Sequence, residues 1–96
     1  MNSRLKNELM DKLFEAVLSL ETIDECYDFF DDLCTIQELK AISQRFQVAG
    51  MLLDKKVYND IAVETGVSTA TISRVNRSLN FGSDGYKAVY EKLGKQ

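Results

Sequence analysis

The sequence contains no histidine, no proline and no tryptophan, and it has only two cysteines among 96 residues. Histidine and CxxC pairs supply most protein zinc sites, so we expect no metal site. Cys26 and Cys34 stand on apolar-rich segments, a pattern typical of reduced cysteines in a core rather than of a disulfide framework. The sequence also lacks an activated cysteine arrangement and a phosphate loop. We therefore expect neither an enzyme with catalytic residues nor a bound cofactor.

The absence of proline leaves no strong helix breaker, and the five glycines stand mostly between helical patterns. An apolar share of 45% predicts a globular chain rather than a disordered one, and the length suits a single domain over residues 1–96. The opening residues MNSRLKNELM lack the apolar run of a signal peptide, and no segment is apolar enough to span a membrane. The sequence predicts a cytoplasmic all-α protein of about six helices.

The formal net charge of −3 by itself disfavours a nucleic-acid partner. However, residues 1–54 carry 5 Lys/Arg against 11 Asp/Glu, whereas residues 55–96 carry 7 against 4. Between Gly66 and Gly82 there are two arginines and no acidic residue. The local charge of a docking face, rather than the total, determines its affinity for phosphates. The distribution indicates that the second half meets a nucleic acid and that the acidic first half suits a dimer core.

The first helical pattern, residues 3–20, is apolar over much more of its circumference than one buried face requires. A helix of this kind needs cover on two sides, and in so short a chain we expect a second copy to supply it. Two capping boxes, Thr22 to Glu25 and Thr35 to Glu38, predict the starts of helices two and three. The second of these helices should end near Asp54. Tyr86, Val89, Tyr90 and Leu93 predict a last amphipathic helix, with Ser83 or Asp84 as its cap.

Residues 58–80 have the pattern of two short helices joined by a tight turn, a helix-turn-helix. Gly66 stands where the first helix must end with positive φ, Val67 is expected to be buried, and Ser68 can cap the second helix. Ile72 and Val75 share its inward face. The outward face carries Thr, Ser, Asn and Arg, which are the residue types that contact base edges and phosphates. We expect the chain to break from Asn80 onward.

Arg45 falls on the apolar side of the helix predicted over residues 35–54, near Ala41, Ala49 and Leu52. Glu38, seven residues earlier, lies on nearly the same line of the helix. One interpretation is structural: the long side chain reaches solvent from apolar surroundings and pairs with Glu38. The other interpretation is that Arg45 faces a cavity and holds a ligand or a phosphate. The residues by themselves leave both open.

The run T-x-x-E-x-x-A-x-x-x-R from Thr35 to Arg45, followed by LL and by A-T-I-S-R-x-x-x-S-L from Ala70 to Leu79, resembles the tryptophan repressor family. It is most similar to the Trp repressor-like YerC/YecD group. This resemblance implies an all-helical, intertwined homodimer. Its core would comprise residues 3–54 and 84–94 of both copies. The two helix-turn-helix heads would then meet successive major grooves of a palindromic operator.

The resemblance also implies the residues that contact DNA. The family uses the start of the recognition helix and the start of the helix before it. Asn76 suits a hydrogen bond to a phosphate or a base edge, and we add Arg77 as a backbone contact because it lies one turn beyond Ser73. The predicted DNA-binding residues are Tyr58, Asn59, Ala62, Thr69, Ala70, Thr71, Ser73, Asn76 and Arg77.

An effector site follows from the same resemblance. The family holds the indole of an amino-acid corepressor between two arginines, which match Arg45 and Arg74. Thr35 and Ser78 match positions near the ligand's ammonium and carboxylate. Val75 departs from the family, which has glycine there, and its branched side chain argues against tryptophan itself as the ligand. The resemblance predicts a small, aromatic, amino-acid-like corepressor.

The function predicted from the sequence is a repressor that binds double-stranded DNA as a homodimer, gated by such an effector. Two alternatives stay open. One is a DNA-binding regulator that responds to no ligand. The other is a protein-interaction module, because a helix-turn-helix scaffold does not fix its function and the total charge is negative.

Overall fold

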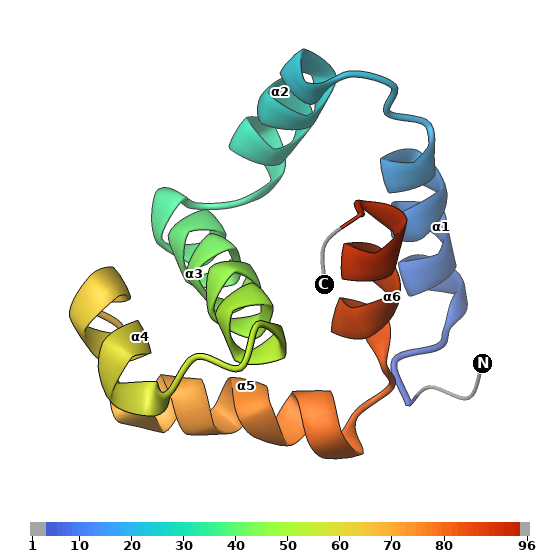
Figure 1. The fold of residues 1–96 in the computed structure, drawn as a ribbon. Coiled ribbons are helices and arrows are strands. Elements are labelled where there is room, and N and C mark those ends of the chain that lie inside the picture. The colour runs from blue at the N-terminus through green and yellow to red at the C-terminus, as the bar shows by residue number, and fades with distance from the viewer. Residues whose placement is uncertain (1–3, 95–96) are drawn as a thin grey trace. The chain divides into compact units, whose positions relative to one another are not determined.

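A computed structural model describes residues 4–94, which form six α-helices joined by short connections (Figure 1). The helices are α1 (Glu8–Leu18), α2 (Ile23–Leu33), α3 (Ile36–Leu53), α4 (Tyr58–Thr65), α5 (Thr69–Phe81) and α6 (Gly85–Lys92). The prediction of an all-α chain with six helices is thus confirmed over these residues. The chain forms two compact units that divide after Ile36. Within residues 4–94, no helix has the length and apolarity needed to cross a membrane.

The N-terminal unit contains α1 and α2, and both begin at side-chain caps. The Asn7 side chain accepts a hydrogen bond from the Met10 amide at 2.8 Å, so α1 begins at Glu8. The expected start near residue 3 is therefore wrong for the described residues, because the cap at Asn7 lies inside the apolar pattern and the helix begins only after it. Ser3 itself lies outside the described residues. The expected cap of α2 is confirmed, since Thr22 Oγ1 accepts from the Glu25 amide at 3.1 Å. Glu25 accepts from the amide of Glu21, one residue before the cap.

Neither α1 nor α2 buries a single residue within the chain. Leu9 is 78% exposed and Leu18 is 83% exposed. Cys26 is an exposed free thiol and Cys34 a half-buried one, so the expectation that both lie in a core is wrong for a single chain. The apolar row that the sequence predicts on α1 is present, but one copy of this unit does not cover it. The reason is that two short helices have too little surface to bury each other's wide apolar arcs.

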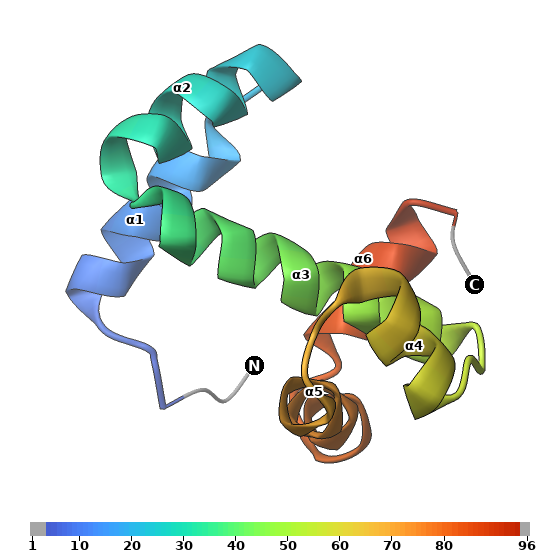
Figure 2. The same cartoon turned by 90° about the vertical axis from the view of Figure 1, so that its left-hand side faces the viewer.

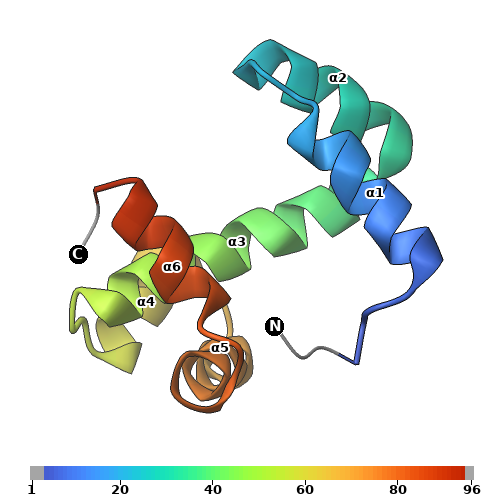
Figure 3. The ribbon, with the colours of Figure 1, turned by 90° about the vertical axis from the view of Figure 1, so that its right-hand side faces the viewer.

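The C-terminal unit is built around the second half of α3, against which α4, α5 and α6 pack. Figures 2 and 3 look along α5 and show α3 running across it. The helix α3 ends at Leu53, one residue before the expected end. Its end is closed by hydrogen bonds from Lys55 to Leu52 and from Lys56 to Met51, with Lys55 at φ +68°, which together form a Schellman motif. The buried core of this unit comprises Val48, Ala49, Ile61, Val67, Ile72, Val75, Leu79 and Tyr90.

The helix α3 buries only part of its apolar circumference. Val48 is fully buried beside Ala49, whereas the apolar residues Ile42 and Phe46 remain partly exposed. The apolar stripe of α3 is wider than the surface that α4, α5 and α6 cover. The position of the core on α3 is therefore decided by which helices pack against it rather than by the centre of its apolar pattern.

An aromatic contact joins α6 to α3. The rings of Phe46 and Tyr90 stack with centroids 4.5 Å apart and planes 10° apart, and the Tyr90 hydroxyl donates to the Phe46 carbonyl at 2.6 Å. Burial raises the pKa of the Tyr90 phenol, so the hydroxyl keeps its proton for this bond. Gly50 makes the close approach possible, because a Cβ at that position would lie 2.7 Å from the Tyr90 oxygen.

The start of α6 differs from the expected cap. Asp84 does precede the helix, but its backbone is left-handed, with φ +62°, and its side chain makes no capping hydrogen bond. The Asp84 carboxylate lies 4.0 Å from the Lys87 ammonium instead. The expectation that the Ser83 or Asp84 side chain caps this helix is therefore wrong for Asp84, because a side-chain cap requires an extended backbone at this position and the Asp84 backbone is left-handed.

We expect Gly50→Ala to lower the free energy of unfolding by about 1–2 kcal/mol, because the new methyl group must displace a tyrosine that stacking and a hydrogen bond hold in place. Gly85→Ala is the matched control, since its Cβ would meet nothing within 4 Å and alanine favours a helix. Chemical denaturation of both variants at one protein concentration measures the difference. Equal stability of Gly50→Ala and the natural protein would contradict the close packing of α6 on α3.

Candidate nucleic-acid interface

The helices α4 and α5 form the helix-turn-helix that the sequence predicts, and each residue of its turn has a separate role. Gly66 ends α4 in the left-handed region, at φ +72°, and its amide donates to the Ala62 carbonyl at 2.9 Å. Val67 follows with 8% of its surface exposed. Ser68 caps α5, since its Oγ accepts from the Thr71 amide at 3.2 Å. The predicted roles of Gly66, Val67 and Ser68 are confirmed.

The inward face of α5 is apolar and fully packed. Ile72 and Val75 are buried against Ile61 of α4, as their helical spacing predicts. The helix continues to Phe81, so the break expected from Asn80 is wrong by two residues. The Asn80 side chain donates to the Asn76 carbonyl at 2.9 Å and thereby supports the last turn. The break comes instead at Gly82, the C-cap.

The outward face of α4 and α5 presents most of the predicted DNA contacts to solvent. The exposed residues among them are Asn59, Thr69, Ala70, Ser73 and Arg77, and the half-buried ones are Tyr58, Ala62, Thr71 and Asn76. The half-buried members include Tyr58 and Ala62, which also pack against the core. The structure therefore brings all nine residues together on one two-helix element, with polar and small side chains outermost.

The charge of this element is positive along α5. Arg74 and Arg77 are both exposed, and neither takes part in the ion pairs formed within residues 4–94. No acidic residue occurs between Gly66 and Gly82. Glu64 of α4 is paired with Lys56 at 3.6 Å. An anionic partner would thus meet two accessible guanidinium groups on α5 without a neighbouring carboxylate on that helix to repel it.

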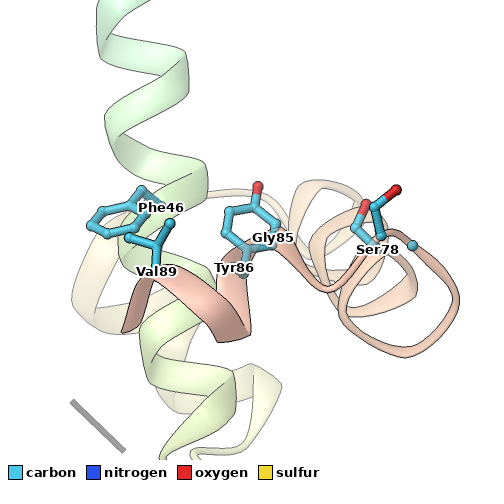
Figure 4. Close-up of a pocket in the computed structure, with 7 residues that line it drawn as sticks. Phe46, Ser78, Gly85, Tyr86 and Val89 are labelled. Atoms are coloured by element: carbon cyan, nitrogen blue, oxygen red, sulfur yellow. The ribbon is translucent and has the colours of Figure 1, made fainter. Parts of the chain in front are cut away.

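A groove of about 570 Å³ lies between α3, α5 and α6 (Figure 4). In Figure 4, Phe46 and Val89 lie at one end, Ser78 lies at the other, and Tyr86 lies between them. The complete lining is Phe46, Ser78, Gly82, Ser83, Gly85, Tyr86 and Val89. The size is within the range of small-molecule pockets, and the lining is mostly aromatic and apolar, with three hydroxyl groups from Ser78, Ser83 and Tyr86.

The four predicted effector residues are only partly brought together. Arg45 is half-buried on α3, next in sequence to Phe46, and none of the ion pairs within residues 4–94 includes it. Arg74 and Ser78 are exposed on α5, but of the four residues only Ser78 lines the groove. Thr35 belongs to the N-terminal unit. The Val75 side chain points into the core, with 1% of its surface exposed.

Sequence reasoning did not identify two features of this region. The first is the groove: Phe46, Tyr86 and Val89 stand at apolar helical spacings, and such periodicity does not distinguish a groove from a core. Thr65 was also missed. Its hydroxyl makes two backbone hydrogen bonds at the end of α4, and the available signal was a threonine directly before the turn glycine.

The family model for the Trp repressor protein matches residues 8–94. The chain belongs to the Trp repressor family. A relative in this family is YerC of Bacillus subtilis, an uncharacterised protein that is 49% identical over 90 residues, or 94% of this chain and 86% of YerC. Trp repressors regulate transcription, so membership of the family argues for regulation rather than catalysis.

Two solved structures extend the match to three dimensions. A TrpR-like protein from Eubacterium eligens superposes with a TM-score of 0.92 at 59% identity, covering 97% of this chain and 96% of that protein. A protein from Staphylococcus aureus, provisionally designated a Trp repressor, superposes with a TM-score of 0.93 at 47% identity and covers 97% and 93%. The resemblance to the Trp repressor family that the sequence suggests is thus confirmed, and so is the Trp repressor-like fold.

Proposed function

We propose that the protein is a cytoplasmic regulator of transcription that binds a specific double-stranded DNA sequence as a homodimer and represses a promoter by occluding it. The observation that carries the proposal is the outward face of α5, which is exposed, free of acidic residues and bears two arginines on a correctly capped helix. Membership of the Trp repressor family supports the same function.

The two ends of α5 suit different parts of a DNA duplex. Thr69, Ala70 and Ser73 are exposed at its N-terminal end, where small side chains allow a close approach to base edges and thymine methyl groups. Arg77 is exposed one turn further on and suits a phosphate. In this arrangement α5 lies with its N-terminal part in the major groove, while Tyr58 and Asn59 at the start of α4 reach the sugar-phosphate backbone.

A second copy of the chain is needed to complete the N-terminal unit. The helices α1 and α2 bury no residue, and isolated helices of 11 residues are marginal in water. Covering their apolar rows with the same rows of a second copy would supply the missing burial, which supports an intertwined dimer. A two-fold dimer presents two helix-turn-helix heads, so we propose a palindromic operator with half-sites about one helical turn apart.

We further propose that a small, aromatic, amino-acid-like molecule acts as corepressor. Arg45 is half-buried on α3 and directly precedes Phe46 in the sequence, and the groove at Phe46, Tyr86 and Ser78 offers aromatic surface together with hydroxyl groups. Arg45 and Arg74 would lie against the two faces of the aromatic ring of such a ligand, and Ser78 would contact one of its polar groups. Binding would couple to DNA affinity because Arg74 and Ser78 belong to α5 itself.

Selection of genomic fragments by the purified protein should enrich one palindromic sequence. We expect Arg77→Ala to weaken binding alike for all sequences and to reduce the salt slope by about 0.9, the value of one lost phosphate contact. Thr69→Asp should abolish specific binding, because it places a carboxylate against the duplex. Lys12→Ala removes the same charge as Arg77→Ala from α1 and serves as the control. If no genomic sequence competes better than random DNA while a protein partner is recovered, the protein-interaction module is the correct function instead.

Sedimentation analysis should show a dimer. We expect Leu9→Lys to raise its dissociation constant at least about tenfold, which corresponds to about 1.4 kcal/mol. Leu9 is 78% exposed in a single chain, where such a substitution changes stability by only about 0.5 kcal/mol or less. Val63→Lys is the matched control, since Val63 is 77% exposed but lies on α4, outside the proposed dimer core. A monomeric natural protein, or equal effects of the two variants, would contradict the dimer.

Calorimetry with tryptophan, indole derivatives and other aromatic acids tests the corepressor. We expect at least one to bind, and Arg45→Ala to weaken its binding at least about tenfold because one of the two guanidinium groups that hold the aromatic ring is lost. Arg77→Ala should leave this binding unchanged. Heats indistinguishable from dilution across the whole panel, with specific DNA binding intact, would show a regulator that needs no ligand.

A further inference from the structure

Thr65, the last residue of α4, joins this helix to the turn of the helix-turn-helix through one hydroxyl group. The hydroxyl donates to the Ile61 carbonyl at 2.7 Å and accepts from the Val67 amide at 3.1 Å, and the residue is half-buried. The first bond fixes the hydroxyl on the final turn of α4. The second holds the middle of the turn against that same point.

The Thr65 hydroxyl supplies an acceptor to a backbone amide of the turn, that of Val67. This amide lies beyond the end of α4 and before the start of α5, so neither helix supplies an acceptor for it. The Val67 side chain is nearly buried in the same core as Ile61 and Ile72. A backbone amide at the edge of a core without a hydrogen bond is unfavourable, and the Thr65 hydroxyl removes that cost.

The turn between α4 and α5 is so short that a single hydrogen bond can fix its conformation. Only Gly66, Val67 and Ser68 separate the two helices. Gly66 has a left-handed backbone, Ser68 caps α5, and the Thr65 hydroxyl fixes Val67 between them. A shift of Val67 would therefore move the N-terminal end of α5, where Thr69 and Ala70 are exposed. Recognition of base edges requires side chains held in accurate geometry.

We infer that Thr65 is a positioning residue: its hydroxyl sets the placement of α5 against α4 and thereby the ability of α5 to distinguish its operator from other DNA. The inference rests on the proposed DNA-binding function. Thr65 itself is not a DNA contact in this arrangement, since its hydroxyl is directed to the backbone of α4 and the turn. Its effect is on discrimination between sequences, whereas general attraction to phosphates depends on the arginines of α5.

Two variants separate the Thr65 hydroxyl from the rest of the side chain, and a third is their control. Thr65→Val keeps the branched shape and removes both hydrogen bonds, whereas Thr65→Ser keeps the hydroxyl and removes the methyl group. Ser43→Ala is the matched control, because the Ser43 hydroxyl also donates to a carbonyl within its helix, that of Lys40 at 2.9 Å, but has no link to the turn. Thermal denaturation establishes that each variant is folded at the assay temperature.

The first readout is amide hydrogen exchange, which does not involve DNA. In Thr65→Val we expect the Val67 amide to exchange at least about tenfold faster than in the natural protein, with Thr65→Ser and Ser43→Ala within about threefold of it. Unchanged protection of Val67 in Thr65→Val would overturn the inference, whatever the protein binds.

The second readout is the ratio of operator to random-duplex affinity, measured at several salt concentrations. Thr65→Val should lower this ratio at least about tenfold and leave the salt slope on random DNA unchanged, while Thr65→Ser restores most of the ratio. If Thr65→Val discriminates as well as the natural protein, or if Thr65→Val and Thr65→Ser lose the same share of the affinity ratio, the inference is overturned but the proposed function stands. If the natural protein binds no duplex sequence better than random DNA, the proposed function fails and so does the role of Thr65 in discrimination. The hydrogen-exchange result then shows separately whether the Thr65 hydroxyl holds the turn.

Discussion

The contact between Ile61 of α4 and Ile72 of α5 is the interaction on which the rest of the helix-turn-helix depends. Both side chains are completely buried, and they pack with Val48 and Ala49 on α3. The helices α4 and α5 have 8 and 13 residues, lengths at which isolated helices are marginal in water. Their packing on α3, rather than their own propensity, therefore keeps the outward face of α5 in place. The surface proposed to bind DNA is stable because its opposite side is a hydrophobic core.

The two units of the chain differ in how much apolar surface each buries by itself. The C-terminal unit has a core of its own, which includes the stacked pair Phe46 and Tyr90. The N-terminal unit, with α1 and α2, buries none of its residues and carries most of the acidic charge. An acidic unit with uncovered apolar rows is poorly suited to DNA and well suited to a second copy of the chain. This division supports a function in which one unit assembles the protein and the other meets its target.

Features that depend on a few neighbouring residues were predictable, and those that depend on distant ones were not. The cap at Thr22, the left-handed Gly66 and the cap at Ser68 all follow from local backbone chemistry. The start of α1 was predicted too early because a polar residue inside an apolar pattern, Asn7, forms the cap. Asp84 is a residue type that caps helices, but its backbone is left-handed and its carboxylate makes no capping hydrogen bond.

The sequence by itself determined the six helices, the helix-turn-helix over residues 58–80 and the outward residues of α5, because apolar period and capping residues specify them locally. Only the tertiary structure decided which face of α3 is buried, that the Tyr90 ring packs closely against Gly50, and that a groove remains between α3, α5 and α6. The hydrogen bond from Tyr90 to Phe46 spans 44 residues. No period or motif in the sequence specifies a contact over that separation, since it depends on how whole helices pack.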